Sequence, residues 1–210
     1  MSKIITIAID AMGGDNSPDK TIQGVNYFLK KNNLNRDYRL DLFGDKKKIE
    51  QKLKQYNISS NLIKVIHTDS VISDEETPIK AIKNSKNTSM WSCIKAQTDG
   101  SADISLSAGN TGVLLVLSKM ILKMIEKVSR PALAGLWPSK KNLNVVLDLG
   151  ANIECSSENL VDFAELGAAL YKSLFPNEMP KVSLLNIGSE EIKGTDSLKS
   201  AYKKLKDLNS

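Results

Sequence analysis

Four short segments rich in glycine and small polar residues follow stretches of sequence that predict β-strands. Glycine lets the backbone approach a ligand closely, and a helix that begins just after such a turn directs free N–H groups at an anion. Asn and Thr side chains add hydrogen-bonding groups without adding charge. The pattern therefore predicts binding of a small anion. The candidate residues are Asp10, Gly13, Gly14, Asn16, Ser107, Gly109, Asn110, Thr111, Gly112, Asp148, Asn152, Asn186 and Lys193.

The segment SAGNTG at residues 107–112 fits this chemistry best, because a strand pattern, a turn of small residues and an apolar helix pattern follow one another without interruption. The segment lacks the GK[ST] ending of a Walker loop and does not match the GxGxxG pattern of dinucleotide sites. For a single turn, the simpler interpretation is that small residues permit a tight connection between strand and helix. Four such turns in one chain favour a binding role.

Arg130 is a further candidate, because the chain uses lysine at nearly every basic position. Among 29 basic residues, only Arg36, Arg39 and Arg130 are arginines. A guanidinium binds phosphate through two parallel hydrogen bonds, which lysine cannot reproduce. A salt bridge to a carboxylate explains Arg130 equally well. Asp10 and Asp148 each end an apolar strand pattern, where a carboxylate orients donors, acts as a base or caps the turn.

Histidine and cysteine are scarce. The single histidine, His67, makes a His-based zinc site improbable and leaves a Ser-His-Asp triad only one base, so we interpret it as structural. Two cysteines are too few for a disulfide framework and have no metal-ligand spacing, which places the chain by default in the reducing cytoplasm. Cys93 falls inside a predicted helix and is assigned to the core. Cys155 follows a turn and has no recognisable activating neighbour.

The elements that must position these residues alternate between short apolar runs and amphipathic stretches. This alternation predicts an α/β fold with a mostly parallel sheet, in a single domain over residues 1–210. Composition is that of an ordinary globular protein, with 41% hydrophobic and 25% charged residues. The predicted strands are 3–10, 38–43, 62–67, 102–107, 132–137, 144–149 and 181–187. The predicted helices are 18–31, 46–56, 77–84, 89–98, 113–127, 158–175 and 196–208.

The charge balance limits the kinds of partner. The formal net charge is +5 and the pI is about 9.0, which suits an acidic protein or an anionic small molecule. Aromatic residues are not interleaved with the basic runs, so no stacking surface for nucleic acid is predicted. The longest apolar stretch, residues 112–125, contains Ser118, Lys119 and Lys123 and is shorter than the roughly 20 residues that cross a bilayer. No signal segment is recognisable at the N-terminus.

Five motifs in fixed order relate these residues to a known family. IAIDAMGGDNSP, SAGNTG, RPALA, LDLGAN and LLNIGSEEIKG resemble the phosphate acyltransferase (PlsX) family, and PIKAIKNSKNTSM resembles its basic stretch before an SM pair. The resemblance covers essentially all 210 residues. It implies an acyltransferase that converts acyl-acyl-carrier protein and inorganic phosphate to acyl phosphate and free carrier protein, for phospholipid synthesis from fatty acids. It also implies a three-layer α/β/α fold similar to the isocitrate and isopropylmalate dehydrogenases.

The resemblance further implies the surroundings of the reaction. The partners are acyl-acyl-carrier protein and inorganic phosphate, and no metal or organic cofactor is required. The family is homodimeric and cytoplasmic, with peripheral association at the inner membrane face. Its members continue past residue 210 through a DGFTGN-like turn and a long amphipathic helical region. We therefore expect this chain to be the N-terminal two-thirds of the family fold, with a complete active site, dimerisation and membrane association dependent on the region beyond.

The resemblance and the residues together give a hypothesis for the site. Phosphate is itself a competent nucleophile toward a thioester, so the protein needs to hold phosphate and stabilise the developing oxyanion. The N–H groups of residues 109–112, with Asn110 and Thr111, are the first candidates, and Gly13, Gly14 and Asn16 are the second. Asn110, Arg130 and Lys193 are the candidate catalytic residues. Two alternatives remain open: a short-chain, coenzyme A-dependent phosphate acyltransferase, and a non-catalytic remnant that binds carrier protein.

Overall fold

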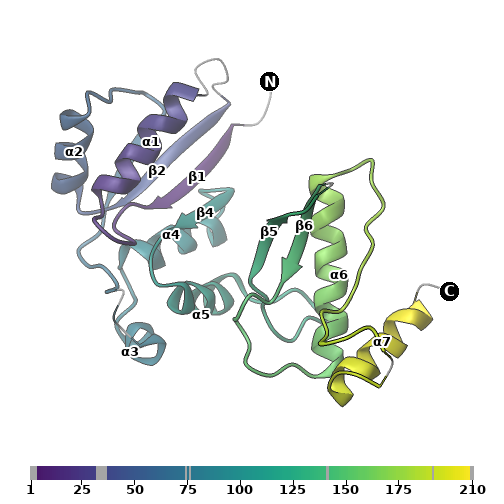
Figure 1. Ribbon diagram of the computed structural model, residues 1–210. Helices are drawn as coiled ribbons and strands as arrows, with labels where there is room; N and C mark the ends of the chain where they lie inside the picture. The colour runs from purple at the N-terminus through teal and green to yellow at the C-terminus, as the bar shows by residue number, and fades with distance from the viewer. Residues whose placement is uncertain are drawn as a thin grey trace. The chain divides into compact units, whose positions relative to one another are not determined.

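The computed structural model describes residues 4–31, 37–73, 75, 77–140, 142–190 and 192–208. Contacts between residues divide the chain into two compact units, residues 1–123 and 124–210, and Figure 1 labels most of their elements. Compact units defined by contacts do not test how many domains the chain has, so the single domain over residues 1–210 stays a prediction.

A parallel sheet forms the centre of the first unit, with strand order β3-β2-β1-β4. Its strands are β1 (Ile5–Asp10), β2 (Tyr38–Gly44), β3 (Ile63–His67) and β4 (Ile104–Ser107). Its helices are α1 (Asp19–Lys31), α2 (Lys46–Gln55), α3 (Pro78–Lys83), α4 (Ser89–Thr98) and α5 (Thr111–Leu122). The predicted α/β class with a mostly parallel sheet is confirmed.

Helices cover both faces of this sheet, because side chains on a strand alternate between its two faces. On one face, Leu42 of β2 belongs to a core cluster with Ile22 of α1 and Ile49 of α2. On the other face, the neighbouring Phe43 belongs to a cluster with Cys93 of α4. The unit thus has three layers, and its apolar clusters lie between the sheet and each helical layer.

The strand order brings two of the predicted turns together. β1 and β4 are parallel neighbours, and their register pairs Asp10 with Ser107, the last residue of each strand. The turns that follow these strands therefore begin at the same edge of the sheet. Parallel α/β sheets bind their ligands at this carboxyl edge.

The second unit is built on a hairpin and two helices. β5 (Ala134–Pro138) pairs antiparallel with β6 (Leu143–Leu147), and α6 (Ser157–Leu174) packs against β6 with Gly167 beside the side chain of Leu147. α7 (Asp196–Leu208) packs on α6 and buries Ala201. Among the described residues, no helix combines the length and apolar content that a membrane crossing requires.

Two predicted elements are wrong. Residues 181–187 form no strand, because a strand pattern needs a neighbour to pair with and these residues make no ladder with any described strand. α5 ends at Leu122 rather than at residue 127, since Lys123 has a left-handed φ of 69°. Ile125, which extends the apolar pattern in the sequence, is 68% exposed. The other predicted strands and helices are present, with ends that differ by up to two residues among the described residues. Residue 3 of the predicted strand 3–10 lies outside them.

An ion pair joins α7 to the first turn of α6 and gives a prediction about pH. Lys204 pairs with Glu158 and holds the pKa of that carboxyl at about 2, below its ordinary 4.5. Because the folded-state pKa is lowered, the stabilisation is present above pH 4.5 and is lost as pH falls toward 2. We expect Lys204→Met to return the pKa of Glu158 toward 4.5. The measurement is an NMR titration of the Glu158 carboxyl carbon, and an unchanged pKa would contradict the pairing.

Candidate functional site

A buried carboxylate lies where β1 and β4 end. Asp10 is 2% exposed. Its Oδ2 accepts a hydrogen bond from Ser107 Oγ at 2.7 Å, and its Oδ1 accepts one from the Met12 N–H at 3.2 Å. A buried carboxylate is stable only when hydrogen bonds replace its hydration, and these two contacts serve that purpose. Asp10 therefore joins the two predicted turns from inside the fold.

Ser107 links Asp10 to the turn that opens α5. Its hydroxyl oxygen accepts a hydrogen bond from the Gly109 N–H at 3.1 Å while its proton is donated to Asp10. The turn that opens α5 is thus held at Gly109 by hydrogen bonds that lead back to the buried Asp10. Such a chain fixes the backbone N–H groups that follow in one orientation.

The glycines of the first turn are needed because this arrangement is tight. A Cβ on Gly13 would lie 2.6 Å from Asp10 Oδ2 and 2.9 Å from both Gly109 N and Ser107 Oγ. Gly14 has a left-handed φ of 85°, and a Cβ there would lie 2.6 Å from the Ala108 carbonyl oxygen. At both glycines the neighbouring turn of the protein itself comes close, so a larger side chain has no room there. The approach to a ligand that we predicted for these glycines stays a prediction.

The start of α5 presents free donors beside this arrangement. The side chain of Asn110 caps the helix by accepting a hydrogen bond from the Val113 N–H at 3.1 Å. Thr111 and Gly112, which are exposed, occupy the first turn, where a backbone N–H has no acceptor within the helix. Asn16 lies in the turn before α1, where its carbonyl oxygen accepts from the Asp19 N–H. The donors suited to an anion are thus backbone groups of Thr111 and Gly112.

A thiol lies beneath the same strand ends. Cys93 of α4 is 1% exposed, as predicted for a core residue, and its Sγ donates to the Leu106 carbonyl oxygen at 3.5 Å. Burial raises the pKa of this thiol to about 12, and the negative charge of Asp10 adds to the effect. Cys93 therefore stays protonated at neutral pH and is a poor nucleophile.

The second unit holds a separate group of predicted residues. Asp148, with a left-handed φ of 60°, follows β6, and its Oδ1 accepts hydrogen bonds from the backbone and side-chain nitrogens of Asn152. Its Oδ2 accepts from Cys155 Sγ at 3.5 Å, and the Asn152 side chain also donates to the Pro131 carbonyl oxygen at 3.0 Å. The carboxylate caps its turn, which is one of the roles that the sequence allowed.

Arg130 lies beside this turn with most of its donors free. Its Nη1 donates to the Glu154 carbonyl oxygen at 2.9 Å, and among the described residues no carboxylate lies within ion-pair distance of the exposed guanidinium. The salt-bridge alternative therefore lacks a described partner. Burial and the hydrogen bond to Asp148 raise the pKa of Cys155, while the positive charge of Arg130 acts in the opposite direction.

Sequence reasoning missed the contact that fixes the segment next to Arg130. Asn159 is 7% exposed and its Nδ2 donates to Ser129 Oγ at 2.7 Å. Asn159 and Ser156 also form a capping box at the start of α6. A cap residue followed three positions later by a polar side chain is a recognisable signal in the sequence, so the box was predictable. The bond to Ser129, 30 residues away, was not.

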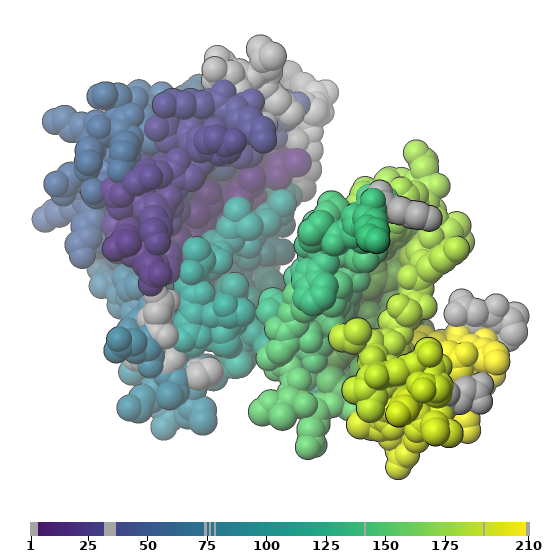
Figure 2. Space-filling model, in the orientation of Figure 1, coloured from purple at the N-terminus to yellow at the C-terminus, as the bar shows by residue number. Residues whose placement is uncertain are grey.

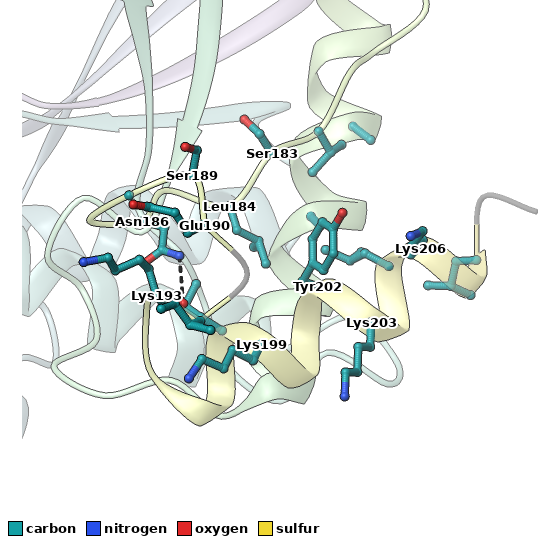
Figure 3. Close-up of a pocket in the computed structure, with 18 of the residues that line it drawn as sticks. Ser183, Leu184, Asn186, Ser189, Glu190, Lys193, Lys199, Tyr202, Lys203 and Lys206 are labelled. Atoms are coloured by element: carbon teal, nitrogen blue, oxygen red, sulfur yellow. Dashed lines mark hydrogen bonds between the residues drawn. The ribbon is translucent and has the colours of Figure 1, made fainter.

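The third group lies in the segment that precedes α7. Asn186 Nδ2 donates to the Lys193 carbonyl oxygen at 3.2 Å, shown as a dashed line in Figure 3. Asn186 Oδ1 accepts from the Ile187 N–H at 2.8 Å, so the same side chain bonds to its own neighbour and to Lys193. The Lys193 side chain is exposed. The structure thus brings Asn186 and Lys193 together, although Asn186 follows no strand.

Comparisons with known proteins relate this chain to a family and to named relatives. A family model described as "Fatty acid synthesis protein" matches residues 5–210. A protein of Pelagibacter ubique named phosphate acyltransferase is 53% identical over 210 residues, covering 100% of this chain and 62% of its own length. One of Paramagnetospirillum magneticum with the same name is 39% identical over 207 residues, covering 99% of this chain and 58% of its own length. This chain thus spans about 60% of the length of these relatives.

Two solved structures share the fold at low sequence identity. A phosphotransacetylase from Streptococcus pyogenes has a TM-score of 0.66 and 15% identity, covering 98% of this chain and 65% of its own. The EutD phosphotransacetylase from Staphylococcus aureus has a TM-score of 0.60 and 16% identity, covering 98% of this chain and 66% of its own. At these identities the similarity shows the fold alone.

Proposed function

This chain belongs to the fatty acid synthesis protein family, whose curated relatives are named phosphate acyltransferase, and on that premise we propose that it catalyses acyl transfer to phosphate. The substrates are acyl-acyl-carrier protein and inorganic phosphate, and the products are acyl phosphate and free carrier protein. A role in phospholipid synthesis and a cytoplasmic location are parts of the same proposal. Homodimeric assembly and peripheral membrane association belong to it through the region that the family has beyond residue 210.

In the proposed reaction, an oxygen of hydrogen phosphate attacks the carbonyl carbon of the thioester. A carbon–oxygen bond forms, the carbon–sulfur bond breaks, and the proton of hydrogen phosphate passes to the leaving sulfur. The backbone N–H groups of Thr111 and Gly112, at the positive end of α5, are suited to bind phosphate or the developing oxyanion. Asn110 would act by holding this turn, through its cap to Val113.

The observation that best supports this proposal is the chain of hydrogen bonds from the buried Asp10 through Ser107 to Gly109. Donors stabilise a developing charge most effectively when they are already oriented before the reaction. The chain of hydrogen bonds supplies that orientation from the protein interior. It also uses both oxygens of the Asp10 carboxylate in hydrogen bonds to the protein.

The reaction is tested by incubating the protein with acyl-acyl-carrier protein and phosphate and trapping acyl phosphate as hydroxamate. We expect formation that depends on phosphate concentration. A parallel reaction with short-chain coenzyme A thioesters tests the alternative substrate class. If neither thioester yields acyl phosphate while carrier protein binds, the non-catalytic alternative holds instead.

The state of the two thiols gives a further prediction. Both thiol pKa values are raised, and Cys93 is also buried, so neither thiol is suited to form an acyl-enzyme. We expect Cys155→Ala to retain phosphate-dependent activity within about twofold, since direct attack by phosphate needs no thiolate. Incubation with radiolabelled acyl-carrier substrate in the absence of phosphate should leave the protein unlabelled. Stoichiometric label on Cys155, or on a serine, would contradict direct attack.

A further inference from the structure

The second unit contains a large groove that the proposed chemistry does not use. Its volume is about 1230 Å³, and it lies between α6, the segment formed by residues 182–190 and 192–193, and α7. Figure 2 shows that segment and α7, in yellow-green and yellow, side by side at the surface. We call this the α6–α7 groove. Leu198, Tyr202 and Leu205 line it from successive turns of α7, and Leu184 faces them from the segment.

Apolar side chains in the groove remain exposed. Ile192 is 80% exposed, Leu208 is 61%, Tyr202 is 53% and Val182 is 49%. Large apolar side chains that stay exposed together within one groove mark an interaction surface. A fatty acyl chain would need an enclosed apolar channel to remove its methylene groups from water, and lining residues this exposed do not provide one.

Basic side chains surround these apolar residues. Lys193, Lys199, Lys203 and Lys206 all line the groove, whereas Glu165 and Glu190 are its acidic members, so lysine outnumbers carboxylate by four to two. Figure 3 shows Lys199 and Lys203 extending outward from α7. Among the described residues, none of these four lysines forms an ion pair. Their charge is therefore available to a partner.

The dimensions favour a polypeptide over a small molecule. Small-molecule sites are typically about 300–1,000 Å³ and bury most of their ligand. This groove exceeds that range and combines an apolar stripe on α7 with flanking positive charge. We propose that the α6–α7 groove docks an acidic amphipathic helix of a partner protein, which is the carrier protein if the proposed function holds. The partner's apolar side chains would contact Tyr202 and Leu205, and its carboxylates would approach the lysines.

Charge reversal tests the docking surface. In Lys199→Glu/Lys203→Glu, both changes lie on α7 and spare Lys204, which pairs with Glu158. We expect the affinity for purified acyl-carrier protein, measured by calorimetry, to fall by at least about tenfold at low ionic strength and by less at 0.5 M salt. The matched control is Lys47→Glu/Lys54→Glu on α2, which removes the same charge from exposed positions. The control should bind carrier protein normally.

A second variant separates charge from contact area. Tyr202 is half-exposed, so Tyr202→Ser should leave the fold intact while removing the largest apolar side chain of the groove. We expect a loss of about tenfold in affinity that does not change with salt. Equal effects of the α7 and α2 reversals would overturn the docking site, as would normal binding by both α7 variants.

The docking inference and the proposed function fail separately. If wild-type protein forms acyl phosphate and the α7 reversal leaves the KM for acyl-carrier protein unchanged, the groove is not the docking site although the activity stands. If no acyl phosphate forms but the reversal weakens binding of carrier protein, the docking site stands without the activity. The same α7 reversal is also tested for binding to anionic phospholipid vesicles. If it weakens vesicle binding and leaves the affinity for carrier protein unchanged, the groove is a membrane-binding surface and the docking proposal is overturned.

Discussion

Gly13→Ala is expected to destabilise the protein by about 1–3 kcal/mol and to lower acyl phosphate formation by about a hundredfold. The added methyl group would lie 2.6 Å from Asp10 Oδ2 and 2.9 Å from Ser107 Oγ and Gly109 N. None of these atoms is the end of a long side chain, so the methyl group can be accommodated only if the two turns separate. Separation breaks the hydrogen bonds that hold Gly109, and the donors of Thr111 and Gly112 then lose their fixed orientation.

The same substitution at Gly24 is the matched control. Gly24 lies in α1, and a Cβ at this position meets no atom within 4 Å. Alanine is favoured over glycine in a helix by about 0.5–1 kcal/mol, so Gly24→Ala should be neutral or stabilising, with full activity. The measurements are chemical denaturation and phosphate-dependent hydroxamate formation. If Gly13→Ala keeps wild-type stability and activity, the hydrogen bonds from Asp10 through Ser107 to Gly109 do not orient the donors of α5.

The sheet edge that carries the hydrogen bonds from Asp10 to Gly109 could be predicted from the sequence, because local patterns mark the ends of its strands. An apolar strand pattern ends at Asp10, another ends at Ser107, and each is followed by small residues. Parallel strands place such ends at one edge. The contact between Asp10 and Ser107 was not predictable, since the two residues are 97 positions apart and the order β3-β2-β1-β4 depends on the packing of the whole unit.

The glycines of the first turn lie close to another part of the protein, and their predicted approach to a ligand stays a prediction. A glycine next to a strand leaves space that a ligand or another part of the backbone can fill. At Gly14 that space is filled by the Ala108 carbonyl oxygen. The local sequence is the same in both cases. Whether another part of the backbone comes close to a glycine depends on the neighbouring turn, which is remote in sequence.

The wrong predictions also have a physical origin outside the local pattern. Residues 181–187 have the composition of a strand, yet strand structure requires a partner ladder, which the described residues do not supply. Leu185 and Ile187 are accordingly 90% and 87% exposed. The apolar pattern of α5 continues beyond Leu122, but the left-handed conformation of Lys123 ends the helix.

Arg130→Lys is expected to weaken phosphate binding by about ten- to a hundredfold. A charge-assisted hydrogen bond contributes about 1.5–3 kcal/mol, and lysine keeps the charge while losing the planar pair of donors. In the structure one donor of Arg130 holds the Glu154 carbonyl oxygen, and no described carboxylate pairs with the rest. The apparent affinity for acyl-carrier protein should change little, because the proposed contact is with the other substrate.

Arg39→Lys is the matched control that separates a structural arginine from a phosphate-binding one. Arg39 donates to both oxygens of the buried Asp41 carboxylate, at 2.8 and 3.1 Å, so its replacement should lower the melting temperature and leave phosphate dependence unchanged. The measurement is phosphate titration of acyl phosphate formation in both variants, together with thermal unfolding. If Arg130→Lys behaves like Arg39→Lys, Arg130 is structural and does not bind phosphate. A raised phosphate requirement in Arg130→Lys alone would assign the guanidinium to phosphate.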